Sequence, residues 1–95
     1  MTDPVATVRD NPEASRFELD VDGQVAFLEY RRRPGAIVLA HTEVPPASRE
    51  RGLASALAKA ALEAARAEGL RVIATCPFVK AYLRKHPELA SPEAR

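Results

Sequence analysis

The stretch Val44-Pro45-Pro46-Ala47-Ser48-Arg49-Glu50-Arg51-Gly52-Leu53-Ala54 decides how the chain is expected to fold. It ends an apolar run at two prolines, which lack a backbone N–H and have a fixed φ angle. It then leads into residues 50–68, where eight alanines and three leucines are strong helix formers. The stretch therefore predicts the end of a strand, a turn and the start of a long helix.

Two turn signals divide the preceding part of the chain into three strands. Residues 16–21 alternate between polar and apolar, and Asp22-Gly23 offers a hairpin turn into a return strand over residues 24–32. Pro34-Gly35 supplies a second turn, into a third strand over residues 36–44. The first turn predicts three cross-strand pairs, Val21 with Gln24, Leu19 with Ala26 and Phe17 with Leu28. The result is an antiparallel meander.

A short strand and a second helix are expected after the long helix. Gly69 ends the helix as its C′ residue, and residues 70–75 form an apolar run typical of a strand. Joined through the helix, this strand should lie parallel to residues 36–44. Pro77 starts a short C-terminal helix, which stops at His86-Pro87. The predicted fold is α/β (α+β), a three-stranded antiparallel meander extended by a parallel strand through one crossover helix.

The long helix should bury one narrow stripe of small residues against the sheet. The predicted buried stripe is Leu53, Leu57, Ala60, Ala64 and Ala67. The predicted solvated stripe is Ser55, Lys59, Glu63 and Arg66.

The ninety-five residues are expected to form a single domain, with residues 1–14 as a mobile arm that can add an edge strand and residues 89–95 as a tail. The net charge of +1 implies neither nucleic acid nor an anionic membrane as partner. A single cysteine, a polar start and the lack of a long apolar run favour the cytoplasm and no membrane span. We expect a monomer or a weak dimer.

The start of the long helix is the candidate binding site. The first N–H groups of a helix have no partner within it, and the peptide dipoles leave that end partly positive. Gly52 allows close approach of the backbone, Ala54 keeps the next turn thin, and Arg49 and Arg51 add cations. This pattern favours a phosphate-bearing ligand. The alternative is an ordinary helix start with solvated arginines; residues 48–54 hold one glycine, which excludes a three-glycine dinucleotide fingerprint.

Three features should converge at one edge of the sheet. The carboxyl ends of parallel strands share an edge, where open α/β sheets usually bind ligands. Val44, the loop before the long helix and Cys76 all lie at that edge in the predicted topology.

The order Arg49-x-x-Gly52-x-Ala54, after a strand and opening a helix, resembles the acetyl-CoA signature of the GNAT superfamily of N-acetyltransferases. The segments His41-Thr42-Glu43-Val44-Pro45 and Cys76-Pro77-Phe78, the latter continuing through Tyr82 to His86-Pro87-Glu88, are similar to its compact single-domain branch. The resemblance covers residues 15–88 as a strand pattern. It implies a minimal GNAT-like fold that takes acetyl-CoA as substrate and moves the acetyl group to an unidentified amine.

The resemblance also implies which residues bind the ligand. The amides at the helix start would hold the pyrophosphate, and the strand end at Val44 would pair with the pantetheine arm. Glu50 stands where many relatives carry a small residue. The implied binding residues are Val44, Arg49, Glu50, Arg51, Gly52, Leu53 and Ala54.

Cys76 and Tyr82 are candidate catalytic groups. Cys76 precedes Pro77 and so occupies a helix N-cap, where the dipole favours the thiolate. A cysteine at this position has been considered catalytic in the compact branch, and the alternative is a small buried hydrophobe. A tyrosine at the position of Tyr82 often protonates the CoA thiolate in relatives, and the alternative is a core aromatic that shares a face with Phe78.

His41 and Glu43 are a candidate base and its partner. They lie on the same face of a strand near its carboxyl end, and either can deprotonate an amine that reaches it. Many relatives carry a glutamate further back on this strand, near the apolar Ile37 and Val38 of this chain. The alternative is that His41 and Glu43 form a structural pair.

Two other functions have little support in the sequence. His41, Cys76 and His86 do not have the spacing of metal ligands, so no metal is expected. Arg31-Arg32-Arg33 is expected to be a solvated hairpin end, and the alternatives are contact with an acidic partner or with the 3′-phosphate of CoA. A nucleic-acid module is a further alternative, but no aromatic residues are interleaved with the arginines as such a module needs. A non-catalytic CoA-binding or protein-interaction domain is the main alternative to an acetyltransferase.

Overall fold

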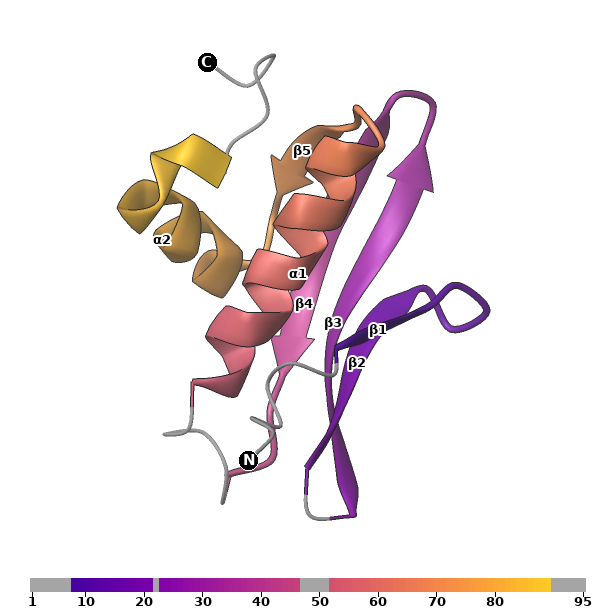
Figure 1. Cartoon of the computed structure of the whole chain (residues 1–95), viewed down its shortest axis with the longest axis vertical. Helices are drawn as coiled ribbons and strands as arrows, with labels where there is room; N and C mark the ends of the chain where they lie inside the picture. The colour runs from indigo at the N-terminus through magenta and orange to yellow at the C-terminus, as the bar shows by residue number, and fades with distance from the viewer. Residues whose placement is uncertain (1–7, 22, 47–51, 90–95) are drawn as a thin grey trace.

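The computed structural model describes residues 8–21, 23–46 and 52–89. In these ranges one five-stranded sheet has the strand order β1-β2-β3-β4-β5, with α1 across one face and α2 packed beside α1 near β5 (Figure 1). The elements are β1 (Arg9–Asn11), β2 (Arg16–Val21), β3 (Gln24–Arg33), β4 (Ala36–Glu43), α1 (Leu53–Ala67), β5 (Arg71–Ala74), α2 (Pro77–Lys85) and the 3₁₀ turn η3 (Pro87–Leu89).

The sheet follows the predicted topology. Strands β1 to β4 pair antiparallel, and β5 pairs parallel to β4 through the crossover helix α1. The β2–β3 register contains the predicted pairs of Leu19 with Ala26 and Phe17 with Leu28. Residues 9–11 add the short edge strand that the predicted N-terminal arm allows, and residues 1–7 lie outside the described ranges. The predicted α+β fold is confirmed.

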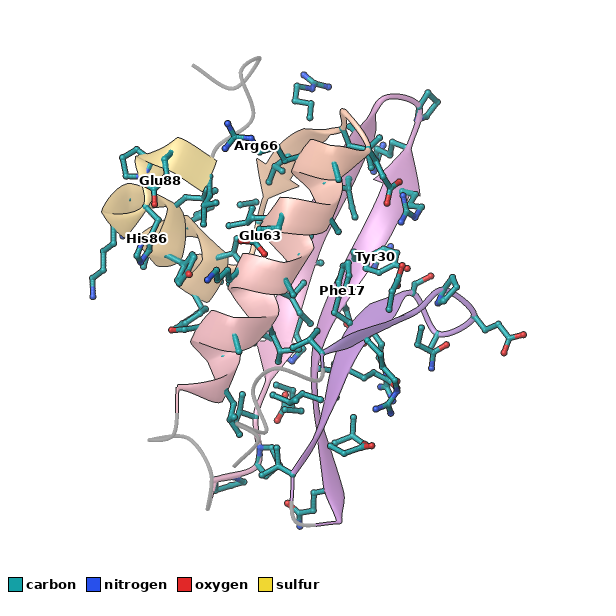
Figure 2. All side chains as sticks on the ribbon, viewed as in Figure 1. Phe17, Tyr30, Glu63, Arg66, His86 and Glu88 are labelled. Carbon is teal, nitrogen blue, oxygen red and sulfur yellow. The ribbon has the colours of Figure 1, made fainter. Side chains whose placement is uncertain are left out.

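The core lies between the sheet and α1. Phe17 and Tyr30 contribute neighbouring rings from β2 and β3, with centroids 5.3 Å apart (Figure 2). On the other side of α1, Arg66 Nη1 donates a hydrogen bond of 2.6 Å to the backbone oxygen of Glu88 and so attaches η3 to the helix (Figure 2). Leu89, the first residue of the predicted tail, packs against the core. Residues 90–95 lie outside the described ranges.

Both the start and the buried face of α1 differ from the sequence prediction. The helix begins at Leu53 rather than at residue 50, because its N-cap Gly52 has a left-handed φ of 73°. Ala67 is exposed, and Ala60 and Ala64 are only half-buried. Compared with the predicted orientation, the buried face of α1 is turned so that it includes Leu62, because burial of a leucine stabilises the fold more than burial of an alanine does. The observed buried stripe is Leu53, Leu57, Ala58, Ala61, Leu62 and Ala65.

Strand β4 contains a bulge that the sequence did not predict. Tyr30 pairs with Leu39 and Glu29 pairs with His41, so Ala40 is an extra residue in β4. A one-residue insertion moves every later side chain to the other face of the strand. Leu39 and Val44, five residues apart, therefore both belong to the core, while His41 is exposed.

Candidate functional site

A cavity of about 430 Å³ opens where β4 separates from β5. The parallel ladder ends at Leu39, whose carbonyl oxygen accepts hydrogen bonds from the N–H groups of both Thr75 and Cys76, at 3.0 and 3.1 Å. Beyond this point β4 continues beside β3 alone, and the chain after β5 turns into α2. The cavity is lined by His41, Thr42, Glu43, Val44, Ala54 and Phe78. Its volume lies in the usual range for small-molecule sites.

The start of α1 borders this cavity. The first helical hydrogen bond runs from the Ala56 N–H to the Gly52 carbonyl oxygen, at 3.1 Å. By helix geometry the N–H groups of residues 53–55 have no acceptor within the helix. Ala54 contributes to the cavity wall, whereas the Leu53 side chain is buried in the core. Arg49, Glu50 and Arg51 lie outside the described residues, and their binding roles stay predictions.

Cys76 lies directly behind the cavity wall. It is the N-cap of α2, is 4% exposed, and its Sγ lies 3.4 Å from Oγ1 of Thr42. Burial raises the pKa of the Cys76 thiol, but hydrogen bonding by Thr42 and by the backbone of Val79 and Phe78 outweighs it, so the net pKa is below its ordinary value. The competition between burial and the helix start, which the sequence leaves open, favours the thiolate.

His41 and Glu43 form the expected pair at the mouth of the cavity. Their side chains are about half exposed, and Nε2 of His41 lies 2.8 Å from Oε1 of Glu43. The Phe27 ring and the imidazole of His41 form an edge-to-face pair, with centroids 6.3 Å apart. The bulge at Ala40 directs both polar side chains to the face of the sheet opposite α1, while Thr42 points toward Cys76. The cavity thus has a titratable pair on one side and a thiol on the other.

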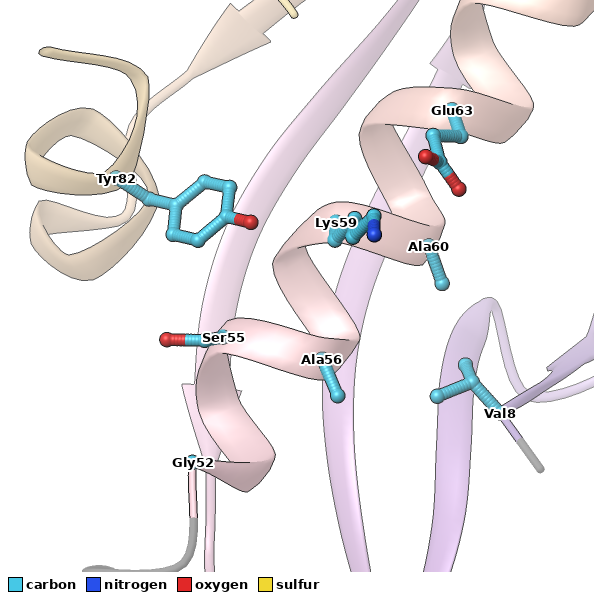
Figure 3. Close-up of a pocket in the computed structure, with 8 residues that line it drawn as sticks. All are labelled: Val8, Gly52, Ser55, Ala56, Lys59, Ala60, Glu63 and Tyr82. Carbon is cyan, nitrogen blue, oxygen red and sulfur yellow. The ribbon is translucent and has the colours of Figure 1, made fainter. Parts of the chain in front are cut away.

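Tyr82 is not among the residues that line this cavity. It lines a neighbouring space of about 500 Å³ along the solvent side of α1, together with Gly52, Ser55 and Lys59, and its hydroxyl points toward α1 (Figure 3). Burial raises the pKa of Tyr82, and the carboxylate of Glu63 and that of Glu88 raise it further. The phenol therefore keeps its proton, but its role as an acid stays a prediction.

Thr42 and Phe78 are cavity residues that were not predicted as site residues. Thr42 alternates with Val44 along the strand, and that pattern was a usable signal for a shared face. Phe78 follows the N-cap of α2 by two residues and is 37% exposed. Its helical spacing predicted that it shares a face with Tyr82. The two rings do stack, with centroids 6.3 Å apart.

The structure also bears on a metal site, on the basic run at residues 31–33 and on membrane spans. Within the described ranges no group of three or more His, Cys, Asp or Glu side chains is placed to hold a metal ion. Arg32 pairs with Glu68 at 3.0 Å and with Asp10 at 3.8 Å, so the middle arginine of the basic run is neutralised on the fold. No helix in the described part of the chain is long and apolar enough to cross a membrane.

The geometry defines a class of site. An α+β domain offers a cavity with a helix N-terminus at one wall, which suits an anionic group attached to a less polar chain. A thiol of lowered pKa lies behind the wall, and perturbed groups of this kind cluster at functional sites.

Comparison with known proteins identifies the family. Residues 16–91 match the GCN5-related N-acetyl-transferase family. Protein NATD1 of Xenopus tropicalis is 34% identical over 91 residues, which cover 90% of this chain and 83% of the relative. Protein NATD1 of Gallus gallus and that of Homo sapiens are each 47% identical over 49 residues; these alignments cover 52% of this chain and 44% and 43% of the two relatives. The chain therefore belongs to the GCN5-related N-acetyltransferase family, as the acetyl-CoA signature at Arg49 to Ala54 indicated.

Proposed function

We propose that this protein binds acetyl-CoA in the cavity between β4, α1 and α2 and transfers its acetyl group to an amine. The observation that carries the proposal is the junction of the cavity with the start of α1, because Ala54 of the first helical turn lines its wall. The pyrophosphate would meet the N–H groups of residues 53–55, where the helix dipole favours an anion. The pantetheine arm would extend from there along Val44 into the cavity.

Cys76 is the thiol in contact with the cavity-lining Thr42, and we assign it to the first chemical step. The Cys76 thiolate attacks the thioester carbonyl carbon, the bond from that carbon to the CoA sulfur breaks, and CoA leaves as a thiolate. Thr42 lines the cavity and its Oγ1 lies 3.4 Å from the Cys76 sulfur, so the thiol is in contact with a residue of the cavity wall. The lowered pKa of the thiol raises the fraction of reactive thiolate at a given pH.

The acceptor amine then attacks the acetyl-cysteine from the open side of the cavity. The nitrogen forms a bond to the carbonyl carbon, the sulfur of Cys76 leaves as a thiolate, and the amine must lose a proton. When Nε2–H of His41 donates to Glu43, the other ring nitrogen of His41 is left to accept that proton. The pair therefore acts as an exposed base held in place by its carboxylate.

Binding and chemistry are tested separately. Calorimetric titration with acetyl-CoA and with CoA tests the cavity, since a protein without this site gives no heat of binding with either ligand. Intact mass after incubation with acetyl-CoA tests the intermediate, as an acetylated cysteine adds roughly 42 Da that Cys76→Ser lacks. If no adduct forms and Cys76→Ser turns over as fast as the wild type, the amine attacks acetyl-CoA directly and Cys76 is a packing residue. CoA binding without transfer to any amine of a chemically diverse panel would indicate a non-catalytic CoA-binding domain.

A further inference from the structure

Two rows of side chains cross β3, β4 and β5 on the face of the sheet opposite α1. Tyr30 and Ile37 point to the core on the α1 side, so the residues that alternate with them along β3 and β4 point to the opposite face. Residues paired across neighbouring strands share a face, which extends the rows to β5. The first row is Arg31, Val38 and Ile73, and the second row is Arg33, Ala36 and Arg71. We call Arg31, Arg33 and Arg71 the arginine patch.

The arginine patch is exposed, and no ion pair engages its side chains within residues 8–21, 23–46 and 52–89. The neighbouring Arg32 differs, because it pairs with Glu68 and Asp10. Val38 and Ala36, in register with the patch, are 8% and 1% exposed although neither belongs to the core cluster on the α1 side. Arginine stems can cover apolar surface while the guanidinium stays in water. The patch therefore presents three guanidinium groups to solvent above a buried apolar floor.

The same face of the sheet is acidic at its other end. Glu29 pairs in register with His41, and Phe27 pairs with Glu43, so these four side chains lie together. Glu29 and Glu43 are both exposed, and Glu43 is the carboxylate that lies 2.8 Å from His41. The charge on this face thus changes sign along β3 and β4, from guanidinium groups at one end to carboxylates at the other.

One extended peptide can reach both ends of the face. Along β3, Arg31 lies about 7 Å and Arg33 about 13 Å from Glu29, at roughly 3.3 Å per residue. An extended peptide has the same rise per residue, so a residue whose amine lies at His41 has neighbours over the arginine patch about two and four positions away.

We propose that this face docks an acidic segment of a protein acceptor, with carboxylates on the arginine patch and the acceptor amine at His41 and Glu43. The placement of the amine rests on the proposed function. Guanidinium groups bind carboxylates through paired, charge-assisted hydrogen bonds. At the other end, Glu29 and Glu43 attract the ammonium form of the arriving amine, which then loses its proton at His41.

The change of sign along the face disfavours two other occupants. A nucleic acid is anionic along its whole length and would meet the carboxylates of Glu29 and Glu43 next to the arginine patch. A second copy of the chain has complementary ends, but four strands about 4.8 Å apart and about eight residues long offer roughly 500 Å² per copy, against about 800 Å² in a standard interface. A short peptide with an acidic end and a cationic end matches the face without either difficulty.

The test measures binding of fluorescent peptides by anisotropy. The probe is a peptide with one lysine and aspartates about two and four positions away, and its counterpart carries asparagines instead. Arg33→Gln and Arg71→Gln each remove one exposed charge of the patch. Arg84→Gln is the matched control, since Arg84 is an exposed arginine on α2 rather than on the sheet. Thermal unfolding checks that all variants are folded, and wild type is titrated separately with acetyl-CoA in the absence of peptide.

Wild type should bind the aspartate peptide more tightly than the asparagine peptide, and added salt should reduce the difference. Arg33→Gln and Arg71→Gln should each weaken binding of the aspartate peptide about two- to fivefold, whereas Arg84→Gln should not. Equal binding of the two peptides, or no effect of either patch variant, overturns the docking surface. Tighter binding of a single-stranded oligonucleotide overturns it in favour of nucleic acid, and a dimer in sedimentation that Arg33→Gln dissociates overturns it in favour of a second copy. Loss of peptide docking leaves the proposed function intact if acetyl-CoA still binds, and failure to bind acetyl-CoA overturns the proposed function alone.

Discussion

Replacing Gly52 with alanine tests whether the start of α1 binds the CoA pyrophosphate, and Gly69 at the other end of the same helix provides a matched control. The two glycines have φ angles of 73° and 70°, and no described atom outside the neighbouring residues lies within 4 Å of an added Cβ at either site. Steric cost is therefore equal and small. Each substitution forces an L-residue into a left-handed conformation, at a cost of about 1–2 kcal/mol.

Both variants should lose similar stability but differ in ligand binding. A loss of about 1 kcal/mol lowers the Tm of a domain of this size by about 4–8 °C, measured by thermal unfolding without ligand. Gly52→Ala also places a methyl group at the anion site, and CoA affinity should fall about tenfold, which corresponds to about 1.4 kcal/mol. Gly69→Ala should keep wild-type affinity in calorimetry at a temperature where both variants are folded. The reasoning is refuted if the two folded variants bind CoA equally well, because the pyrophosphate then lies elsewhere.

Four further substitutions address single interactions. Thr42→Val removes the hydroxyl that lowers the pKa of Cys76, so the pH midpoint of thiol alkylation should rise; an unchanged midpoint would mean that Thr42 does not stabilise the thiolate. The Arg16 guanidinium, 2.6 Å from Glu18, lowers the pKa of this carboxyl below its ordinary 4.5. Burial raises the pKa of Glu18, but Asn11 and Arg9 lower it further, so the net pKa is lowered. Ionised Glu18 therefore stabilises the fold at neutral pH and loses this effect as the pH falls through its lowered pKa, so thermal unfolding from about pH 5 to about pH 2 should show a steeper decline for wild type than for Glu18→Gln. His41→Gln should lower turnover at least about tenfold at unchanged CoA affinity, and a rate equal to wild type would leave His41 and Glu43 as a structural pair. Tyr82→Phe keeps the ring and should keep CoA affinity, whereas a fall in turnover at that affinity would mark the hydroxyl as the acid.

The parts of the fold that the sequence predicted depend on local chemistry. The pair of Phe17 with Leu28 follows from a two-residue turn and from alternation along both strands. Pro77 and His86-Pro87 bound α2 because proline tolerates only certain helix positions. The parallel placement of β5 follows from a crossover connection of helical length. None of these features requires knowledge of distant contacts.

The bulge in β4 was missed because its sequence carries no periodic signal. Residues 36–40 are all apolar, and an inserted residue there does not disturb any visible alternation. Its position is decided by tertiary packing, since Leu39 and Val44 both have to reach the core on the α1 side. The sequence predicted that Val44, the start of α1 and Cys76 lie at one edge, whereas the contact of Thr42 with Cys76 depends on the face that the bulge assigns to Thr42.

The bulge at Ala40 also links the separate features of the candidate site. It follows Leu39, whose carbonyl oxygen accepts hydrogen bonds from the N–H groups of Thr75 and Cys76 just after β5. The strands β4 and β5 therefore separate where the register of β4 changes. Beyond it Thr42 faces Cys76, and His41 and Glu43 face the opposite side of the sheet. Without the extra residue, alternation would turn His41 toward α1 and move Thr42 away from the thiol. A single inserted residue thus brings Thr42 next to the thiol and turns His41 and Glu43 to the other side, which is the arrangement that the proposed two-step acetyl transfer requires.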